Sequence, residues 1–148
     1  MHSIQSLLLA MVVGLAACSP VDLPNQPYNL PERVGPGKQN LSASTAVSLF
    51  QQYCLATAPS FAAAGPAMRA SGQFHNAPID VYYLRGLNAQ IRINETSGNW
   101  RCTMVFRSDA GASGLANTFR SMRVPGVIVF FQTTNGGTFS AIAQAQGL

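Results

Sequence analysis

Prolines gather between residues 20 and 36, and this clustering limits where the chain can form a regular fold. They are Pro20, Pro24, Pro27, Pro31 and Pro36. Proline fixes φ and removes a backbone donor, so this density excludes helix and sheet and favours an extended chain. The sequence therefore predicts one globular domain over residues 44–148. A domain of that length buries only a modest core, so a crosslink would contribute much to its stability.

An apolar run over residues 7–17 precedes the prolines. It is too short to cross a bilayer as a permanent helix, and it has the length of a signal-peptide core. The run ends in Leu15-Ala16-Ala17-Cys18, which resembles the lipobox of bacterial lipoproteins. The resemblance implies that residues 1–17 are a cleaved signal peptide and that the Cys18 thiol carries diacylglycerol. Residues 18–43 would then be a lipidated tether that holds the domain at the membrane.

The start of the chain departs from the lipoprotein pattern, because no Lys or Arg precedes Cys18. Ser19 follows the cysteine, and in that family a residue other than Asp at this place favours the outer membrane over the inner one. We expect a location in the cell envelope, facing the periplasm.

With Cys18 assigned to lipid, Cys54 and Cys102 remain as an even pair in an oxidising compartment. Both lie among apolar residues, so we expect a structural disulfide that joins a helix to a strand. Two free thiols or a redox pair are the alternatives, although redox cysteines usually lie close together as Cys-x-x-Cys. The stretch 50–61 and Trp100-Arg101-Cys102 are similar to small exported alphaproteobacterial proteins with such a cysteine pair, over residues 44–107. That resemblance implies no assigned activity.

Helical spacing of apolar residues predicts a first helix from Ser44, capped by Ser42 or Ser44 and ended by Pro59. A second helix is expected over 61–71, interrupted by Pro66. A third is expected over 115–122, capped by Asp109.

Strands are expected at 79–84, 90–94, 101–107, 127–132 and 138–144, the last two joined by a hairpin loop at 135–137. This order predicts an α+β domain with a mainly antiparallel sheet of about five strands, about three helices and one disulfide.

The chain carries a net charge of +4, although only 9% of its residues are charged. This excess favours anionic partners, while an exported chain without a Lys/Arg-dense segment argues against nucleic acid. Alternation places Arg92 and Arg107 on the polar side of their strands, and with Arg85 and Arg101 they are a candidate anion-binding patch. An ordinary solvated sheet face is the alternative.

Candidate catalytic groups are few, and we expect no catalytic residue, no metal and no cofactor. His75 is the only histidine after Cys18, too few for a metal site. The leading hypothesis is a non-enzymatic envelope lipoprotein that binds an anionic lipid, wall polymer or protein. The alternatives are an inhibitor or assembly accessory of an envelope enzyme such as a lysozyme, and a small hydrolase that uses His75.

Overall fold

The structure is a computed structural model that describes residues 38–77, 80–134 and 136–147. The predicted signal peptide, Cys18 and most of the predicted tether lie outside the described residues. Ile79 and Asn135, which were expected in a strand and a turn, also lie outside them.

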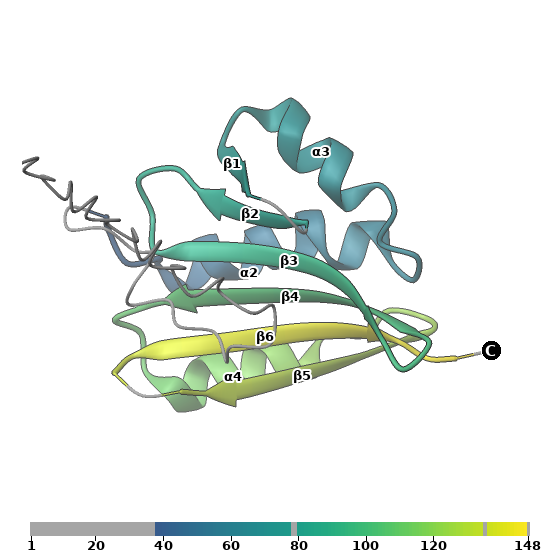
Figure 1. The fold of residues 1–148 in the computed structure, drawn as a ribbon. Coiled ribbons are helices and arrows are strands. Elements are labelled where there is room, and N and C mark those ends of the chain that lie inside the picture. The colour runs from purple at the N-terminus through teal and green to yellow at the C-terminus, as the bar shows by residue number, and fades with distance from the viewer. Residues whose placement is uncertain (1–37, 78–79, 135, 148) are drawn as a thin grey trace, which may run out of the picture.

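Six antiparallel strands form one sheet in the order β1-β2-β3-β4-β6-β5 (Figure 1). Their bounds are Phe74–Ala77 for β1, Val81–Leu84 for β2, Ala89–Thr96 for β3, Asn99–Arg107 for β4, Val127–Thr133 for β5 and Thr138–Ala145 for β6. β4 lies at the centre because it pairs with both β3 and β6. The predicted α+β class with an antiparallel sheet is confirmed, with one strand more than expected.

The additional strand is β1, a short edge strand. Its sequence is Phe-His-Asn-Ala, which has little intrinsic strand preference beyond the phenylalanine. β1 pairs along its whole length with β2, with Phe74 opposite Leu84. Phe74 is also buried and stacks edge-on with Tyr53, at 5.1 Å between ring centroids. Tertiary packing therefore makes this segment a strand.

Three α-helices accompany the sheet: α2 at Ala43–Tyr53, α3 at Ala64–Ser71 and α4 at Ala112–Ser121. A short 3₁₀ helix, η1 at Leu55–Thr57, follows α2. α2 and α4 lie on one face of the sheet, and α3 lies beside β1 (Figure 1). Among the described helices, none has the length and apolar character needed to cross a membrane.

Of two predicted helix N-caps, one is present in the structure and the other is not. Ser42 caps α2 as predicted, since its hydroxyl accepts a hydrogen bond from the Thr45 N–H at 3.1 Å. The prediction that Asp109 caps the third helix is wrong. Gly111 is the N-cap of α4, without a side-chain cap bond, and Asp109 instead accepts a hydrogen bond from Asn40 at 2.7 Å.

The first two helices are shorter than predicted. α2 ends at Tyr53, well before Pro59. α3 begins at Ala64 because Phe61 has a φ of 55°, a left-handed conformation that helix propagation excludes. Pro66 falls in the first turn of α3, where proline costs no hydrogen bond, so it does not interrupt the helix.

The folded part starts before Ser44. Gln39 bridges Leu87 and Leu41 bridges Ser108, both in parallel orientation. Leu41 is only 2% exposed, and its carbonyl accepts a hydrogen bond from the Ser108 hydroxyl. Residues 39–42, assigned to the tether by composition, therefore belong to the domain.

The core lies between the sheet and the helices. Five phenylalanine rings connect α2, α4 and three strands through centroid distances of 5.2–5.8 Å. They are Phe50, Phe106, Phe119, Phe131 and Phe139. The predicted disulfide between Cys54 and Cys102 is confirmed, with both residues fully buried and their Cα atoms 5.4 Å apart. It joins the end of α2 to the central strand.

Candidate functional site

The outer face of the sheet, on the side away from α2 and α4, is the first candidate surface. Along β4, Cys102, Met104 and Phe106 belong to the core, whereas Thr103 and Val105 take the opposite phase. Successive side chains of a strand point to opposite faces, so the register assigns each strand's residues to one face. The alternation that the sequence predicted for residues 101–107 is therefore present.

Three of the four predicted arginines belong to this outer face: Arg92 on β3 and Arg101 and Arg107 on β4. Arg92 lies opposite Thr103, one diagonal step from Arg101, which corresponds to about 7–8 Å between backbones. Arg107 is six residues along β4 from Arg101, or about 20 Å. Its Nη2 donates a hydrogen bond to the Gly136 carbonyl at 2.9 Å. We call Arg92, Arg101 and Arg107 the outer-face arginines.

Arg85 does not join them. It follows β2, is exposed, and its Nη1 lies 3.4 Å from the His75 Nε2. It also lines a small pocket with Thr45 and Leu49 of α2, on the helix side. The sequence could not separate Arg85 from the others, because alternation does not extend beyond the end of a strand.

Acidic residues are absent from the outer phase of the described strand residues. Glu95 shares the phase of Ile91 and Ile93, which face the core. Asp80 precedes β2 and lines a cavity on the helix side, and Asp109 follows β4 beside Asn40. Among the described strand residues, the outer face therefore carries arginines and no carboxylate.

Several polar atoms on the outer face are buried without a hydrogen-bond partner: Asn94 Oδ1, Arg101 Nε and Ser140 Oγ. Ser140 is 2% exposed, and its strand phase assigns it to the face opposite α2 and α4. Buried polar atoms usually have partners, so these three groups distinguish the outer face from the apolar core face. Asn94 and Ser140 were not among the candidate residues predicted from the sequence, although their strand phase was a signal that could have identified them.

His75 lies on the exposed edge strand β1, and its described side-chain neighbour is Arg85. Within the described ranges, no group of three or more His, Cys, Asp or Glu side chains is placed to hold a metal ion. Among the described residues, the His75 side chain has a hydrogen-bond contact with Arg85, and no carboxylate or hydroxyl is placed beside it as a catalytic partner.

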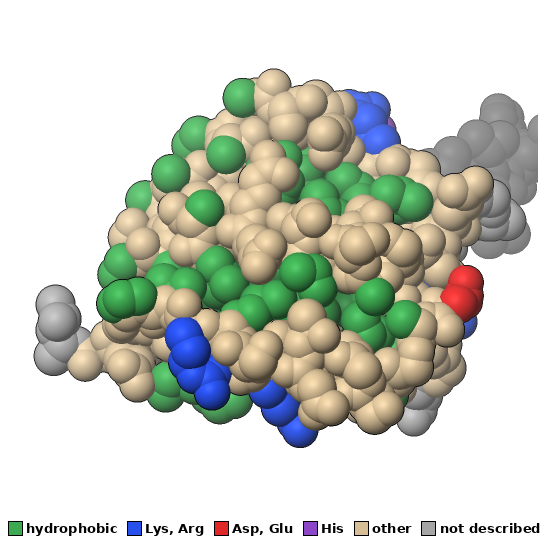
Figure 2. Space-filling view, turned by 180° about the vertical axis from the view of Figure 1, so that it is seen from behind, with side chains coloured by type: hydrophobic (Ala, Val, Ile, Leu, Met, Phe, Trp, Pro, Cys, Tyr) green, Lys and Arg blue, Asp and Glu red, His purple; other side chains and the backbone are tan. Residues whose placement is uncertain are grey.

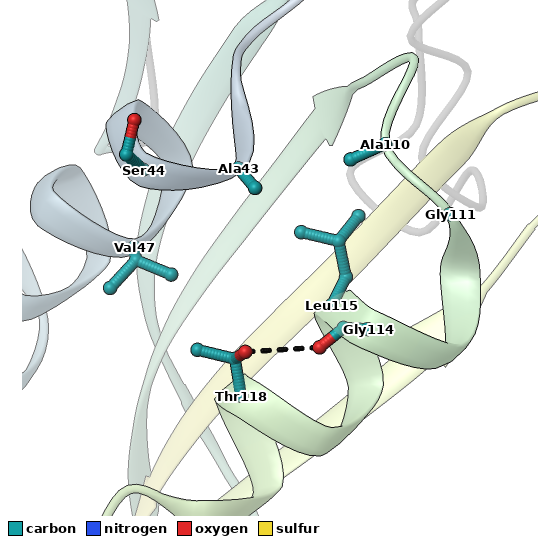
Figure 3. Close-up of a pocket in the computed structure, with 8 residues that line it drawn as sticks. All are labelled: Ala43, Ser44, Val47, Ala110, Gly111, Gly114, Leu115 and Thr118. Carbon is teal, nitrogen blue, oxygen red and sulfur yellow. Dashed lines mark hydrogen bonds between the residues drawn. The ribbon is translucent and has the colours of Figure 1, made fainter.

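A groove runs between α2 and α4 on the helix side. Figure 2 looks onto this side and shows a hollowed band of hydrophobic side chains. The groove has a volume of about 480 Å³, and Val47 and Leu115 point into it (Figure 3). The Thr118 hydroxyl at its edge donates to the Gly114 carbonyl at 3.0 Å. None of its described lining residues is charged, whereas the outer face carries arginines.

Comparisons with known proteins and structures identify no relative of this chain. No protein-family model matches the chain, and no curated protein and no solved structure matches it significantly.

Proposed function

We propose that this chain is a lipid-anchored protein of the bacterial envelope that binds an anionic partner through the outer face of its sheet. The observation that carries the binding proposal is the charge distribution: three arginines and no acid among the described strand residues of that face. Arg92 and Arg101 are half-buried and adjacent. A guanidinium so placed presents a planar set of donors that fits phosphate and carboxylate.

Two features support the location. The lipobox ending at Cys18 supplies the anchor, and a buried disulfide is typical of proteins that fold outside the reducing cytosol. A tether of about 20 residues in extended form would let the domain stand roughly 60 Å from the membrane. The domain would then act by binding, with no catalytic group of its own.

The anchor is tested by mass spectrometry of the protein from its native host. We expect a mature chain that begins at Cys18 and carries the mass of a diacylglycerol with a further acyl chain. A Cys18→Ala variant should keep its leader and lose the lipid. Recovery of wild-type chain with the leader attached and the Cys18 thiol free would overturn the anchor.

The binding proposal is tested with the double variant Arg92→Gln/Arg101→Gln. We expect its binding to vesicles containing anionic phospholipid, or to purified acidic wall polymer, to fall at least tenfold at low salt. In intact cells, crosslinking to an acidic envelope protein should fall in the same way. The matched control is Arg120→Gln/Arg123→Gln, which removes the same charge from the end of α4 on the helix side.

Wild-type binding should also weaken as salt rises, because long-range attraction between charges is screened. Equal binding by the two double variants to all three kinds of partner would contradict the proposal. So would wild-type binding to none of them.

A further inference from the structure

A second set of polar groups lies on the helix side of the sheet, around the hydroxyl of Tyr82. Arg69 on α3 donates a hydrogen bond from Nη1 to this hydroxyl at 2.6 Å. The hydroxyl in turn lies 3.5 Å from Asp80 Oδ1, at the long limit for a hydrogen bond. A cation and an anion therefore flank one phenol oxygen, and the described part of the chain shows no ion pair between them.

These groups open onto a cavity of about 270 Å³. Its apolar wall comes from Phe61, Pro66, Ile93 and Trp100. The volume lies just below the range of pockets for drug-sized ligands, so it fits a smaller molecule. An apolar wall with a few converging polar groups is the usual composition of a small-molecule site.

Gly65 is needed for this arrangement. A Cβ atom at this position would lie 2.5 Å from the Tyr82 hydroxyl oxygen, a separation that real Cβ atoms essentially never show. Glycine in the first turn of α3 thus lets the buried phenol reach the cavity.

Two residues of the cavity have a left-handed backbone. Phe61 has a φ of 55° and Asp80 a φ of 50°. This conformation is unusual for a bulky aromatic residue, and such conformations concentrate at ligand sites. At Asp80 it places an exposed carboxylate at the cavity, where its one described hydrogen bond is the long contact with Tyr82.

The phenol itself remains neutral under physiological conditions. Burial is the largest cause and raises the pKa of Tyr82; the charge of Asp80 adds to the rise, and the charge of Arg69 opposes it. The hydroxyl therefore keeps its proton and contacts both Arg69 and Asp80. Arg69 has five N–H donors and uses one of them here, so others can serve a ligand.

We propose that this cavity binds a small zwitterion, a free α-amino acid with an apolar side chain. Its carboxylate would pair with Arg69, its ammonium with Asp80, and its side chain would pack against Ile93 and Trp100. A dianion would meet Asp80 and a dication would meet Arg69, while an uncharged ligand would leave both charges without a partner. The site is independent of the outer face and goes beyond the proposed function.

Trp100 makes the test direct. It is the only tryptophan of the chain, it is 44% exposed, and it lines the cavity. Titration of the purified full-length protein with L-leucine should produce a saturable change in its emission. L-leucinamide, which lacks the carboxylate, and N-acetyl-L-leucine, which lacks the ammonium, should each bind at least tenfold more weakly. Equilibrium dialysis with labelled leucine measures the same binding without relying on fluorescence.

Substitutions test which protein side chain pairs with each charged group of the amino acid. Arg69→Gln should remove the preference for leucine over leucinamide, and Asp80→Asn the preference for leucine over N-acetyl-leucine. Arg123→Gln, an exposed arginine outside the cavity, should bind leucine like the wild type, and so should Arg92→Gln/Arg101→Gln. No binding of leucine or phenylalanine by dialysis would overturn the proposal. Equal binding of leucine and its two derivatives by the wild type would also overturn it, whatever the variants do.

Discussion

The two faces of the sheet are built from the same strands but differ in the side chains that they carry, although Thr103 and Val105 at the centre of the outer face are also buried. The face toward α2 and α4 holds the phenylalanine rings and the disulfide, and Cys102, Met104 and Phe106 on β4 are fully buried there. The opposite face carries the outer-face arginines, with Phe130 and Ile128 each 41% exposed on β5. Since the side-chain period of a strand is two, one sequence can encode a core on one face and a contact surface on the other. Stability should therefore depend on the first face, and binding on the second.

The largest effect is expected from a matched pair of phenylalanines. Phe119 is fully buried and contacts the rings of Phe50 and Phe131, so Phe119→Ala should lower the free energy of unfolding by about 3–5 kcal/mol. Phe130→Ala removes the same atoms from the outer face and should cost less than about 1 kcal/mol. Urea denaturation measures both. Equal losses would mean that the outer face is packed like a core, and the contrast between the faces would fail.

The second largest effect on stability is expected from the disulfide, which lies on the helix side of the sheet. Cys54→Ala/Cys102→Ala should lower the free energy of unfolding by about 2–4 kcal/mol, because the bond closes a loop of 48 residues in sequence separation. Wild-type protein unfolded in the presence of a reductant is the matched control and should lose a similar amount. If the double variant is as stable as the oxidised wild type, the bond does not brace the core.

A smaller effect is expected at the start of α2. Ser42→Ala removes the acceptor of the Thr45 N–H and should cost about 1 kcal/mol in thermal unfolding. Ser44→Ala is the control, since the described contact of its hydroxyl is with the Ser42 side chain and not with a backbone N–H. A Ser44 effect equal to that of Ser42 would place the cap elsewhere.

The smallest effect on stability is expected from the outer-face arginines. Arg92→Gln/Arg101→Gln should change the free energy of unfolding by no more than about 0.5 kcal/mol, measured by urea denaturation. The same variant should lose binding to the anionic partner. A large loss of stability would instead show that these arginines help to hold the fold together. The outer face would then contribute to stability as well as to binding.

Local patterns in the sequence predicted much of this molecule. Alternation on β4, the cap at Ser42 and the hairpin between β5 and β6, in which Gly136 and Gly137 have positive φ, all appear in the structure. Each depends on a few neighbouring residues, so no knowledge of the rest of the chain is needed. The pairing of Cys54 with Cys102 was predictable for a different reason, because assigning Cys18 to lipid left one pair.

The positions at which the structure differs from the sequence-based predictions depend on contacts with residues far away in the chain. β1 is a strand because β2 pairs with it, and Asp109 is drawn away from α4 by Asn40. Arg85 leaves the outer face because β2 ends just before it. The cavity at Tyr82 needs α3, β2 and β4 together, since Arg69 and Trp100 come from different elements.

By itself, then, the sequence determined the class of the domain, the faces of its strands and the residues available for a disulfide. Only the tertiary structure decided which strands are neighbours, and hence which charges share a surface and which meet in a cavity. The physical reason is that hydrophobic period is a local property of the backbone, whereas strand order and register depend on contacts between segments far apart in the chain.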